Sequence, residues 1–223
     1  MYRRHFIATC LLASGVGINV GTSMAATPAA APKPATIMTA TILIVGDSLS
    51  AEYGLKRGSG WAALLDQRLQ TEKINAKVVN ASISGDTTSG GRSRLPALLA
   101  QHKPTHVILE LGGNDALRGL PLQMTQDNLA QMTQLAQKAG AKVLLVGMEV
   151  PPNYGADYSA RFAATFKTVA TASRAGLVPF FLKGIADVPN AIQNFQADRI
   201  HPKEEAHPAM LANVWPELKK LLK

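Results

Sequence analysis

The feature that most restricts the fold is a run of five apolar or β-branched residues that leads directly into a glycine, an aspartate and a serine. The run covers residues 41–45, and Gly46-Asp47-Ser48 follows it. Five such residues without polar alternation are typical of a strand that is buried on both faces, as in a parallel sheet. Open α/β sheets bind their ligands at the carboxyl ends of their strands. The sequence therefore predicts that Ser48 lies at the functional edge of a sheet.

These residues alone leave two interpretations of Ser48 open. Gly46 allows a sharp turn, and Ser48 would then lie near a helix N-terminus, where free N–H groups favour negative charge. In that position Ser48 would be a nucleophile whose own N–H faces the oxyanion that it creates. Glycine, aspartate and serine are also ordinary turn residues at strand ends, so the choice depends on the rest of the chain.

The first 40 residues differ in composition from the remainder. A basic start, an apolar stretch over residues 6–20 and a small-residue motif predict a secretory signal peptide over residues 1–26. The apolar stretch is too short and too rich in glycine for a good membrane span. Three prolines among alanines predict a linker over residues 27–40, which leaves residues 41–223 as the folded domain.

Composition excludes several classes of function. The chain has 23 lysine and arginine residues against 15 acidic ones, for a formal net charge of +8. The basic residues are scattered rather than gathered in a run or stripe, so we expect no nucleic-acid partner. The only cysteine, Cys10, lies in the predicted signal peptide, so the mature protein would have no disulfide and no thiol nucleophile. No metal-binding pattern of histidine and cysteine and no glycine-rich nucleotide motif occurs, and we predict no metal and no cofactor.

Strand and helix patterns alternate over the rest of the chain, which calls for a parallel sheet with helices on both faces. We predict one α/β domain with a five-stranded parallel sheet, because residues 41–223 contain no internal repeat and no segment of clearly different amino-acid composition. Strands are predicted at residues 41–45, 76–83, 105–111, 142–150 and 177–182. Helices are predicted at about residues 61–70, 125–139, 159–175 and 203–222, with one more that ends near residue 100.

Small polar clusters follow three of the predicted strands. Because parallel strands all end at one edge of a sheet, these clusters should converge there. A fourth cluster, residues 198–202, precedes the last helix and would fold over the same edge. Together they supply the hydroxyl, imidazole, carboxylate and N–H donors that acyl transfer from an ester or thioester needs. The three strand-end clusters are Gly46-Asp47-Ser48, Ser84-Gly85-Asp86 and Gly112-Gly113-Asn114-Asp115.

Each of these groups has a role in acyl transfer. The hydroxyl of Ser48 would attack the acyl carbonyl, and His201 would take its proton and return it to the leaving group. Asp198, three residues before His201, would bind the second imidazole nitrogen and stabilise the imidazolium. The predicted oxyanion donors are the N–H groups of Ser48 and Gly85 and the side-chain amide of Asn114.

The four blocks resemble those of the SGNH (GDSL) hydrolase family and occur in the family's order. The likeness covers nearly all of the chain after residue 40. The longer strings at residues 79–87, 94–99, 110–115 and 152–155 are similar to a bacterial periplasmic branch of thioesterases, lysophospholipases and arylesterases. The resemblance implies a flavodoxin-like, three-layer α/β/α fold, a periplasmic location and the catalytic roles given above.

Four acidic residues in or near the blocks have other expected roles. Asp47 is predicted to stabilise the turn beside Ser48, and Asp86 and Asp115 are predicted to cap the helices that follow them. Glu52 stands where the branch usually has a glycine. A carboxylate there, close to the nucleophile loop, would disfavour anionic substrates.

We therefore predict a secreted, monomeric serine esterase that acts on small-molecule aryl esters, acyl thioesters and lysophospholipids and does not insert stably into a membrane. Two alternatives stay open: a carbohydrate acetylesterase with the same triad, and a non-catalytic periplasmic binding protein on the same fold. The loop at residues 150–155 is either a turn stiffened by two prolines or the lip of an acyl pocket formed by Val150, Pro151 and Tyr154.

Overall fold

A computed structural model describes the protein over residues 39–223. The predicted signal peptide, residues 1–26, lies outside the described residues, and so does the predicted linker, residues 27–40, except for its last two residues. Within the described part of the chain, no helix is both long and apolar enough to cross a membrane.

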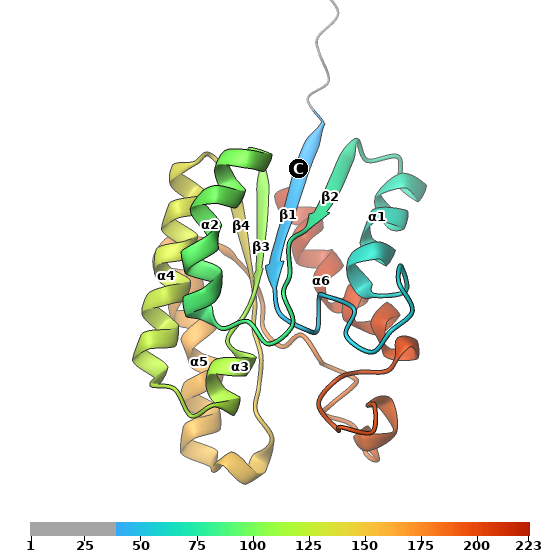
Figure 1. Ribbon diagram of the computed structural model, residues 1–223, viewed down its shortest axis with the longest axis vertical. Coiled ribbons are helices and arrows are strands. Elements are labelled where there is room, and N and C mark those ends of the chain that lie inside the picture. Colours follow the sequence, from blue (N-terminus) through green and yellow to red (C-terminus); the bar gives the residue numbers. More distant parts are fainter. Residues whose placement is uncertain (1–38) are drawn as a thin grey trace, which may run out of the picture. The chain divides into compact units, whose positions relative to one another are not determined.

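Five strands form one parallel sheet, as the sequence predicted. The strand order is β2-β1-β3-β4-β5, and each neighbouring pair is parallel (Figure 1). The first strand is therefore flanked by β2 and β3, and the segments that follow these two strands leave the sheet on either side of the Ser48 turn. The strands are β1 (Ala40–Gly46), β2 (Ala76–Asn80), β3 (His106–Glu110), β4 (Lys142–Val146) and β5 (Gly176–Val178).

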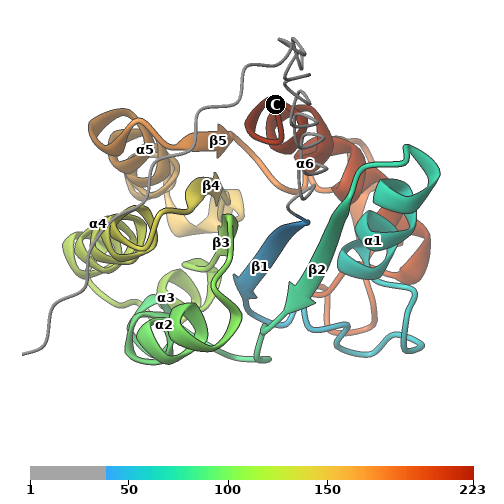
Figure 2. The same cartoon turned by 90° about the horizontal axis from the view of Figure 1, so that it is seen from above.

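Helices cover both faces of the sheet, which confirms the predicted α/β class. Figure 2 shows α1 and α6 on one face and α2, α4 and α5 on the other. The helices are α1 (Trp61–Thr71), α2 (Thr88–His102), α3 (Gly113–Leu117), α4 (Leu122–Lys138), α5 (Ala156–Ser173) and α6 (His207–Leu221), and the short 3-10 turns are η1 (Pro152–Tyr154), η2 (Ala191–Asn194) and η3 (Glu204–Ala206).

Burial on both faces explains why the first strand is an unbroken apolar run. Residues 42–45 have no exposed surface, and Trp61 at the start of α1 has none either. The Trp61 ring packs edge-on against Phe181, with 5.4 Å between the ring centroids. Complete burial of an apolar side chain stabilises the fold by about 1.5–3 kcal/mol. A polar residue at any of these strand positions would therefore disturb the core that carries the Ser48 turn.

Three strands are shorter than predicted by three or more residues at their carboxyl ends, and β3 is shorter by one. The second strand stops at Asn80 because the Asn80 side chain accepts the N–H of Ser82 (3.1 Å), which turns the chain. β4 stops at Val146 and β5 stops at Val178, its partner in the ladder. The next hydrogen bond between them, from the Phe181 N–H to the Gly147 carbonyl (2.8 Å), skips one residue and breaks the regular ladder.

Two helices also differ from the prediction. α6 begins at His207 rather than near residue 203, with Pro208 in its first turn, where the missing N–H of a proline is not needed. The five-residue α3 was not predicted. Its start at Gly112-Gly113 has the composition of a turn, and Gly112 has a φ of +122°, which favours glycine.

The predicted helix cap at Asp86 is wrong. Thr87 caps α2 instead, because its hydroxyl accepts the N–H of Gly90 (3.3 Å). The Asp86 carboxylate forms an ion pair with Arg94 at 2.8 Å.

Asp115 caps a different helix from the one predicted. It lies fully buried inside α3, and its carboxylate accepts the N–H of Thr88 (2.8 Å), the first residue of α2. The hydroxyls of Thr88 and Thr125 also donate to this carboxylate, and Asn128 in α4 donates to Thr88 (2.9 Å). A buried polar network thus joins α2, α3 and α4.

Candidate active site

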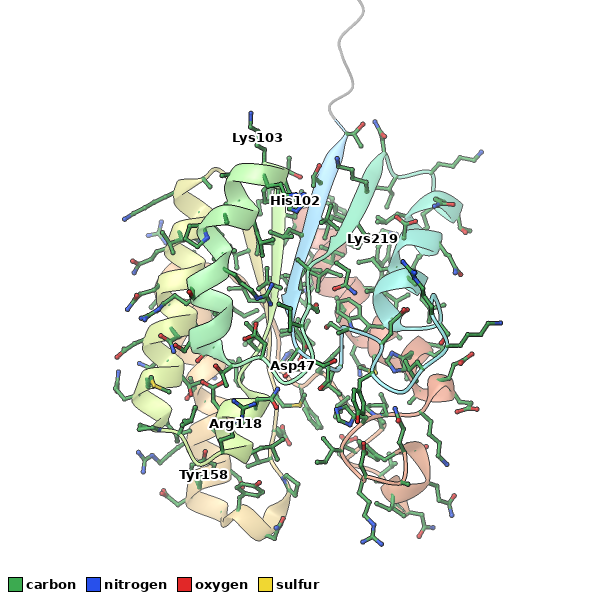
Figure 3. All side chains as sticks on the ribbon, in the orientation of Figure 1. Asp47, His102, Lys103, Arg118, Tyr158 and Lys219 are labelled. Atoms are coloured by element: carbon green, nitrogen blue, oxygen red, sulfur yellow. The ribbon has the colours of Figure 1, made fainter. Side chains whose placement is uncertain are left out.

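The predicted nucleophile, base and acid come together at the carboxyl edge of the sheet. Ser48 lies two residues beyond the end of β1, and its Oγ is 2.9 Å from Nε2 of His201, 153 positions away in the sequence. The other imidazole nitrogen, Nδ1, is 2.7 Å from Oδ2 of Asp198. Figure 3 shows Asp47, next to Ser48, at this edge, and His102 and Lys103 at the opposite edge.

The loop before α6 fixes the orientation of Asp198. Its Oδ1 accepts the backbone N–H groups of Ile200 (2.9 Å) and His201 (3.0 Å), which leaves Oδ2 to the imidazole. Partial desolvation would raise the pKa of Asp198, but these hydrogen bonds and the one from the His201 ring outweigh it and lower the pKa to about 2. An ionised carboxylate accepts the Nδ1 proton, so Nε2 of His201 is free to accept the proton of Ser48.

The predicted oxyanion donors lie on the segments that follow β1, β2 and β3. Gly85, after β2, has a φ of +78°, and its carbonyl accepts a hydrogen bond from the guanidinium of Arg118 (2.8 Å). Arg118 follows α3 directly, and Asn114 lies within that helix. Among the described residues, nothing accepts the N–H of Ser48 or of Gly85, so both remain available to a substrate oxygen.

Asp47 orients the side-chain amide of Asn114. One carboxylate oxygen accepts an Asn114 N–H (3.0 Å), and the other accepts the N–H of Leu49 (3.0 Å). The bond to Leu49 confirms the predicted role of Asp47 in the turn. The bond to Asn114 was not foreseen from the sequence. A primary amide has two N–H groups, so one remains for a substrate oxygen when the other is held by Asp47.

Two carboxyl groups are buried beneath the Ser48 turn. Asp47 and Glu110 are each only 3% exposed. Glu110 Oε2 accepts the Ser50 hydroxyl (2.6 Å) and the backbone N–H of Asp47 (3.3 Å), and the Trp61 indole N–H donates to Ser50 (3.1 Å). Burial raises the pKa of Asp47 to about 6, and burial together with the nearby charge of Asp47 raises the pKa of Glu110 well above its ordinary value.

Glu110 is a structural member of the site that sequence reasoning missed. A signal was present, because Glu110 is the one charged side chain within the apolar strand pattern of residues 105–111. Acidic residues are almost never fully buried without a partner. A lone acid in a buried strand therefore predicts a polar partner nearby, which is Ser50 on the nucleophile turn.

The Glu52 carboxylate turns toward its own loop. Its oxygens accept the N–H of Gly58 (3.1 and 2.9 Å) and of Gly60 (2.9 Å). The backbone of Glu52 has a φ of +60°, in the left-handed region that favours glycine. This conformation agrees with the glycine expected at this position from the resemblance to the periplasmic thioesterase, lysophospholipase and arylesterase branch. The three hydrogen bonds hold the loop between β1 and α1.

The predicted acyl-pocket residues lie in the loop that follows β4, at the same edge of the sheet as Ser48. Val150 is half-buried and Pro151 is exposed. Tyr154 lies in η1, and its ring is 6.0 Å from the ring of Tyr158 in α5. No hydrogen bond or ring contact within the described residues joins these side chains to Ser48, so their role in binding stays a prediction.

The described residues contain no group of three histidine, cysteine, aspartate or glutamate side chains that could hold a metal ion. The Asp198 carboxylate bonds to His201 and to two backbone N–H groups, and the Asp47 carboxylate bonds to Asn114 and to the N–H of Leu49. The hydrogen bond between Ser48 and His201 is a path along which the hydroxyl proton can pass to the imidazole.

Comparison with known proteins identifies the family. The model of the GDSL-like Lipase/Acylhydrolase family matches residues 44–209. Esterase TesA of Pseudomonas aeruginosa is 53% identical over 82% of this chain and 89% of that protein. Thioesterase 1/protease 1/lysophospholipase L1 of Escherichia coli is 44% identical over 75% of this chain and 78% of that protein.

A solved structure supports the same assignment. The psychrotrophic esterase EstA from Pseudoalteromonas, in a structure inhibited by monoethylphosphonate, aligns with a TM-score of 0.76 and 41% identity over 82% of this chain and 98% of that one. All of these proteins are named as esterases or as a thioesterase, which argues against the alternative of a non-catalytic binding protein. The chain belongs to the GDSL-like lipase and acylhydrolase family and is a hydrolase of ester bonds.

Proposed function

We propose that the protein is a serine esterase with Ser48 as nucleophile, His201 as general base and Asp198 as the residue that orients His201. The observation that carries this proposal is the continuous hydrogen-bonded chain from Ser48 through His201 (2.9 Å) to Asp198 (2.7 Å). The distances are those at which a proton passes between heavy atoms.

The reaction follows from this chain of groups. As the Ser48 oxygen bonds to the acyl carbon, His201 takes the hydroxyl proton, and the imidazolium is stabilised by Asp198. His201 then gives that proton to the departing alcohol or thiol, which leaves an acyl ester on Ser48. A water molecule then gives a proton to His201 and its oxygen attacks the acyl carbon. The bond to the Ser48 oxygen breaks, His201 returns the proton to that oxygen, and the carboxylic acid leaves.

The oxyanion that forms in both steps would be stabilised by three donors: the N–H groups of Ser48 and Gly85 and the amide of Asn114. Loss of one donor of this kind typically raises the barrier by about 3–4 kcal/mol. Gly85 suits its position because its φ of +78° lies in the left-handed region, where a residue with a side chain would be strained. Asn114 suits its position because an amide donates without the negative charge of an aspartate.

We further propose aryl esters, acyl thioesters and lysophospholipids as the substrate class, with the acyl chain bound by Val150, Pro151 and Tyr154. The names of the relatives, an esterase, an arylesterase and a thioesterase 1/protease 1/lysophospholipase L1, support this range. Removal of residues 1–26 as a signal peptide and a periplasmic location form part of the same proposal.

The test compares the wild-type protein with Ser48→Ala and with the control Ser93→Ala, which changes an exposed serine of α2. We expect S48A to lose hydrolysis of a short p-nitrophenyl ester and to take up no mass from an organophosphonate. The control S93A should keep both. Turnover by S48A at the wild-type rate would overturn the assignment of the nucleophile.

A chain-length series tests the substrate class separately. We expect the wild-type protein to hydrolyse p-nitrophenyl esters of medium-length acyl chains as well as acetate. Val150→Asp should raise KM for the longer esters more than for acetate, because a charge opposes burial of an apolar chain. Hydrolysis of acetate alone would favour the acetylesterase alternative.

A further inference from the structure

An aromatic ring covers the imidazole of the proposed general base. The ring of Tyr53 lies with its centroid 4.3 Å from that of His201, at an interplanar angle of 35°. Tyr53 is on the nucleophile loop, five residues after Ser48, whereas His201 is on the loop before α6. Both loops lie beyond the carboxyl end of the sheet in Figure 1. The Tyr53 side chain remains 49% exposed, so it does not serve mainly to fill the core.

The backbone beneath this ring is fixed to both loops. The Tyr53 N–H donates to the Ser48 carbonyl (3.4 Å), and the Tyr53 carbonyl accepts the side-chain amide of Gln196 (3.0 Å). The backbone N–H of Gln196 in turn donates to the carbonyl of His201 (2.8 Å). One glutamine therefore bonds to the backbone of both residues whose rings are in contact.

Gly54 makes the close approach of Gln196 possible. It has a φ of +70°, and a Cβ at this position would lie 2.1 Å from Oε1 of Gln196. Any side chain at Gly54 would push Gln196 away from the Tyr53 carbonyl. The contact between the two loops is thus built from a glycine, a glutamine and an aromatic ring.

The chemistry of the proposed mechanism gives this ring a role. His201 becomes a cation while the tetrahedral intermediate forms, and a cation within about 6 Å of an aromatic centroid is attracted to the ring face. Two carboxylates interact with His201: Asp198 on its own loop and Asp47 on the turn after β1. The Tyr53 ring acts on a face of the imidazole, whereas Ser48 and Asp198 contact its edge at the two nitrogens.

We propose that Tyr53 is a positioning residue that holds the His201 imidazole between Ser48 and Asp198 and favours its cationic form during the reaction. The inference rests on the proposed function, because it depends on His201 as the general base. The ring and not the hydroxyl carries the effect, since the Tyr53 hydroxyl makes no hydrogen bond with another described residue.

Three substitutions separate the possible effects of the ring. Tyr53→Phe keeps the aromatic face, Tyr53→Leu keeps apolar volume without that face, and Tyr53→Ala removes both. We expect Y53F to match wild type, and Y53L and Y53A to lower kcat by about 2- to 10-fold with little change in KM. The acid limb of the pH–kcat/KM profile should move to lower pH in Y53L and Y53A by about half a pH unit.

The outcomes distinguish this inference from the proposed function itself. If the wild-type protein hydrolyses p-nitrophenyl esters and S48A does not, the proposed function stands, and the Tyr53 series then tests the inference alone. The inference would be overturned if the acid limbs of the pH–kcat/KM profiles coincided in Y53F, Y53L and Y53A. It would also be overturned if Y53F lost as much kcat as Y53A. A rise in KM without a change in kcat would also overturn it, because that result would make Tyr53 a substrate contact.

Discussion

Replacing Asp47 with asparagine should lower kcat and, above about pH 6, raise the free energy of unfolding. The Asp47 carboxylate accepts two N–H groups, one from the Leu49 backbone and one from the Asn114 side chain, each at 3.0 Å. Asparagine has a single carbonyl oxygen. When that oxygen faces Leu49, the new NH2 group faces the NH2 group of Asn114, and two donors repel each other. The Asn114 amide then turns away from the position where the oxyanion forms.

The two expected effects have opposite signs. Loss of an oxyanion donor corresponds to a fall in kcat of about 10²- to 10³-fold, with KM little changed, because the donor acts mainly in the transition state. Burial, however, raises the pKa of Asp47 from 3.8 to about 6. The folded pKa exceeds the unfolded one, so the ionised carboxylate lowers the free energy of unfolding above about pH 6, by about 3 kcal/mol in full. That penalty fades as the pH falls toward 3.8.

Kinetics and unfolding test both effects. The D47N variant should lose most of its kcat for a p-nitrophenyl ester, whereas adding D47N to Asn114→Ala should change kcat by less than about threefold, since both act through one amide. The free energy of unfolding in urea, taken as D47N minus wild type, should be larger at pH 8 than at pH 4.5, because only the wild type carries the buried charge at pH 8. The control Asp127→Asn, an exposed residue of α4, should match wild type. Additive losses in the double variant, or a stability difference independent of pH, would refute the reasoning.

Two further predictions concern the other carboxylates of the site. Glu110→Gln should fold and keep kcat within about threefold, because its pKa is raised by burial and the amide oxygen still accepts the Ser50 hydroxyl, whereas Glu110→Ala should lower the urea unfolding free energy by about 2–4 kcal/mol. Equal stability of these two variants would contradict the assigned network. Glu52→Gly removes a strained φ of +60° worth about 1–2 kcal/mol but also the acceptor of the Gly58 and Gly60 N–H groups. Amide hydrogen exchange at these two glycines should therefore speed up, and unchanged protection would show that Glu52 does not hold the loop.

Much of the fold could be predicted because it depends on local pattern and on one rule about parallel sheets. The apolar run at residues 42–45 has no polar alternation, and a strand of this kind needs helices on both faces. Since parallel strands end at one edge, Ser48, Gly85 and Asn114 were expected to lie together although they are far apart in the sequence. The contact between Ser48 and His201 agrees with that expectation.

The parts that could not be predicted depend on contacts between irregular segments. The contact of Tyr53 with His201 occurs beside a left-handed residue, Glu52, and a hydrogen bond from Gln196 to the Tyr53 carbonyl. Neither feature produces a regular spacing of apolar residues, so neither can be predicted from the sequence pattern. The cap at Asp115 was assigned to the wrong helix because proximity in the sequence suggested the helix that follows, whereas the acceptor reaches α2 across space.

The buried Asp115 network has a consequence for the order in which the enzyme matures. A helix of five residues is not stable alone, so α3 depends on its bonds to Thr88 in α2 and to Thr125 in α4. Asn114, the neighbour of Asp115, can take its place only after these longer helices have docked. Turnover should therefore be the last property regained during refolding. The time course of recovered esterase activity would then report the docking of α2 and α4.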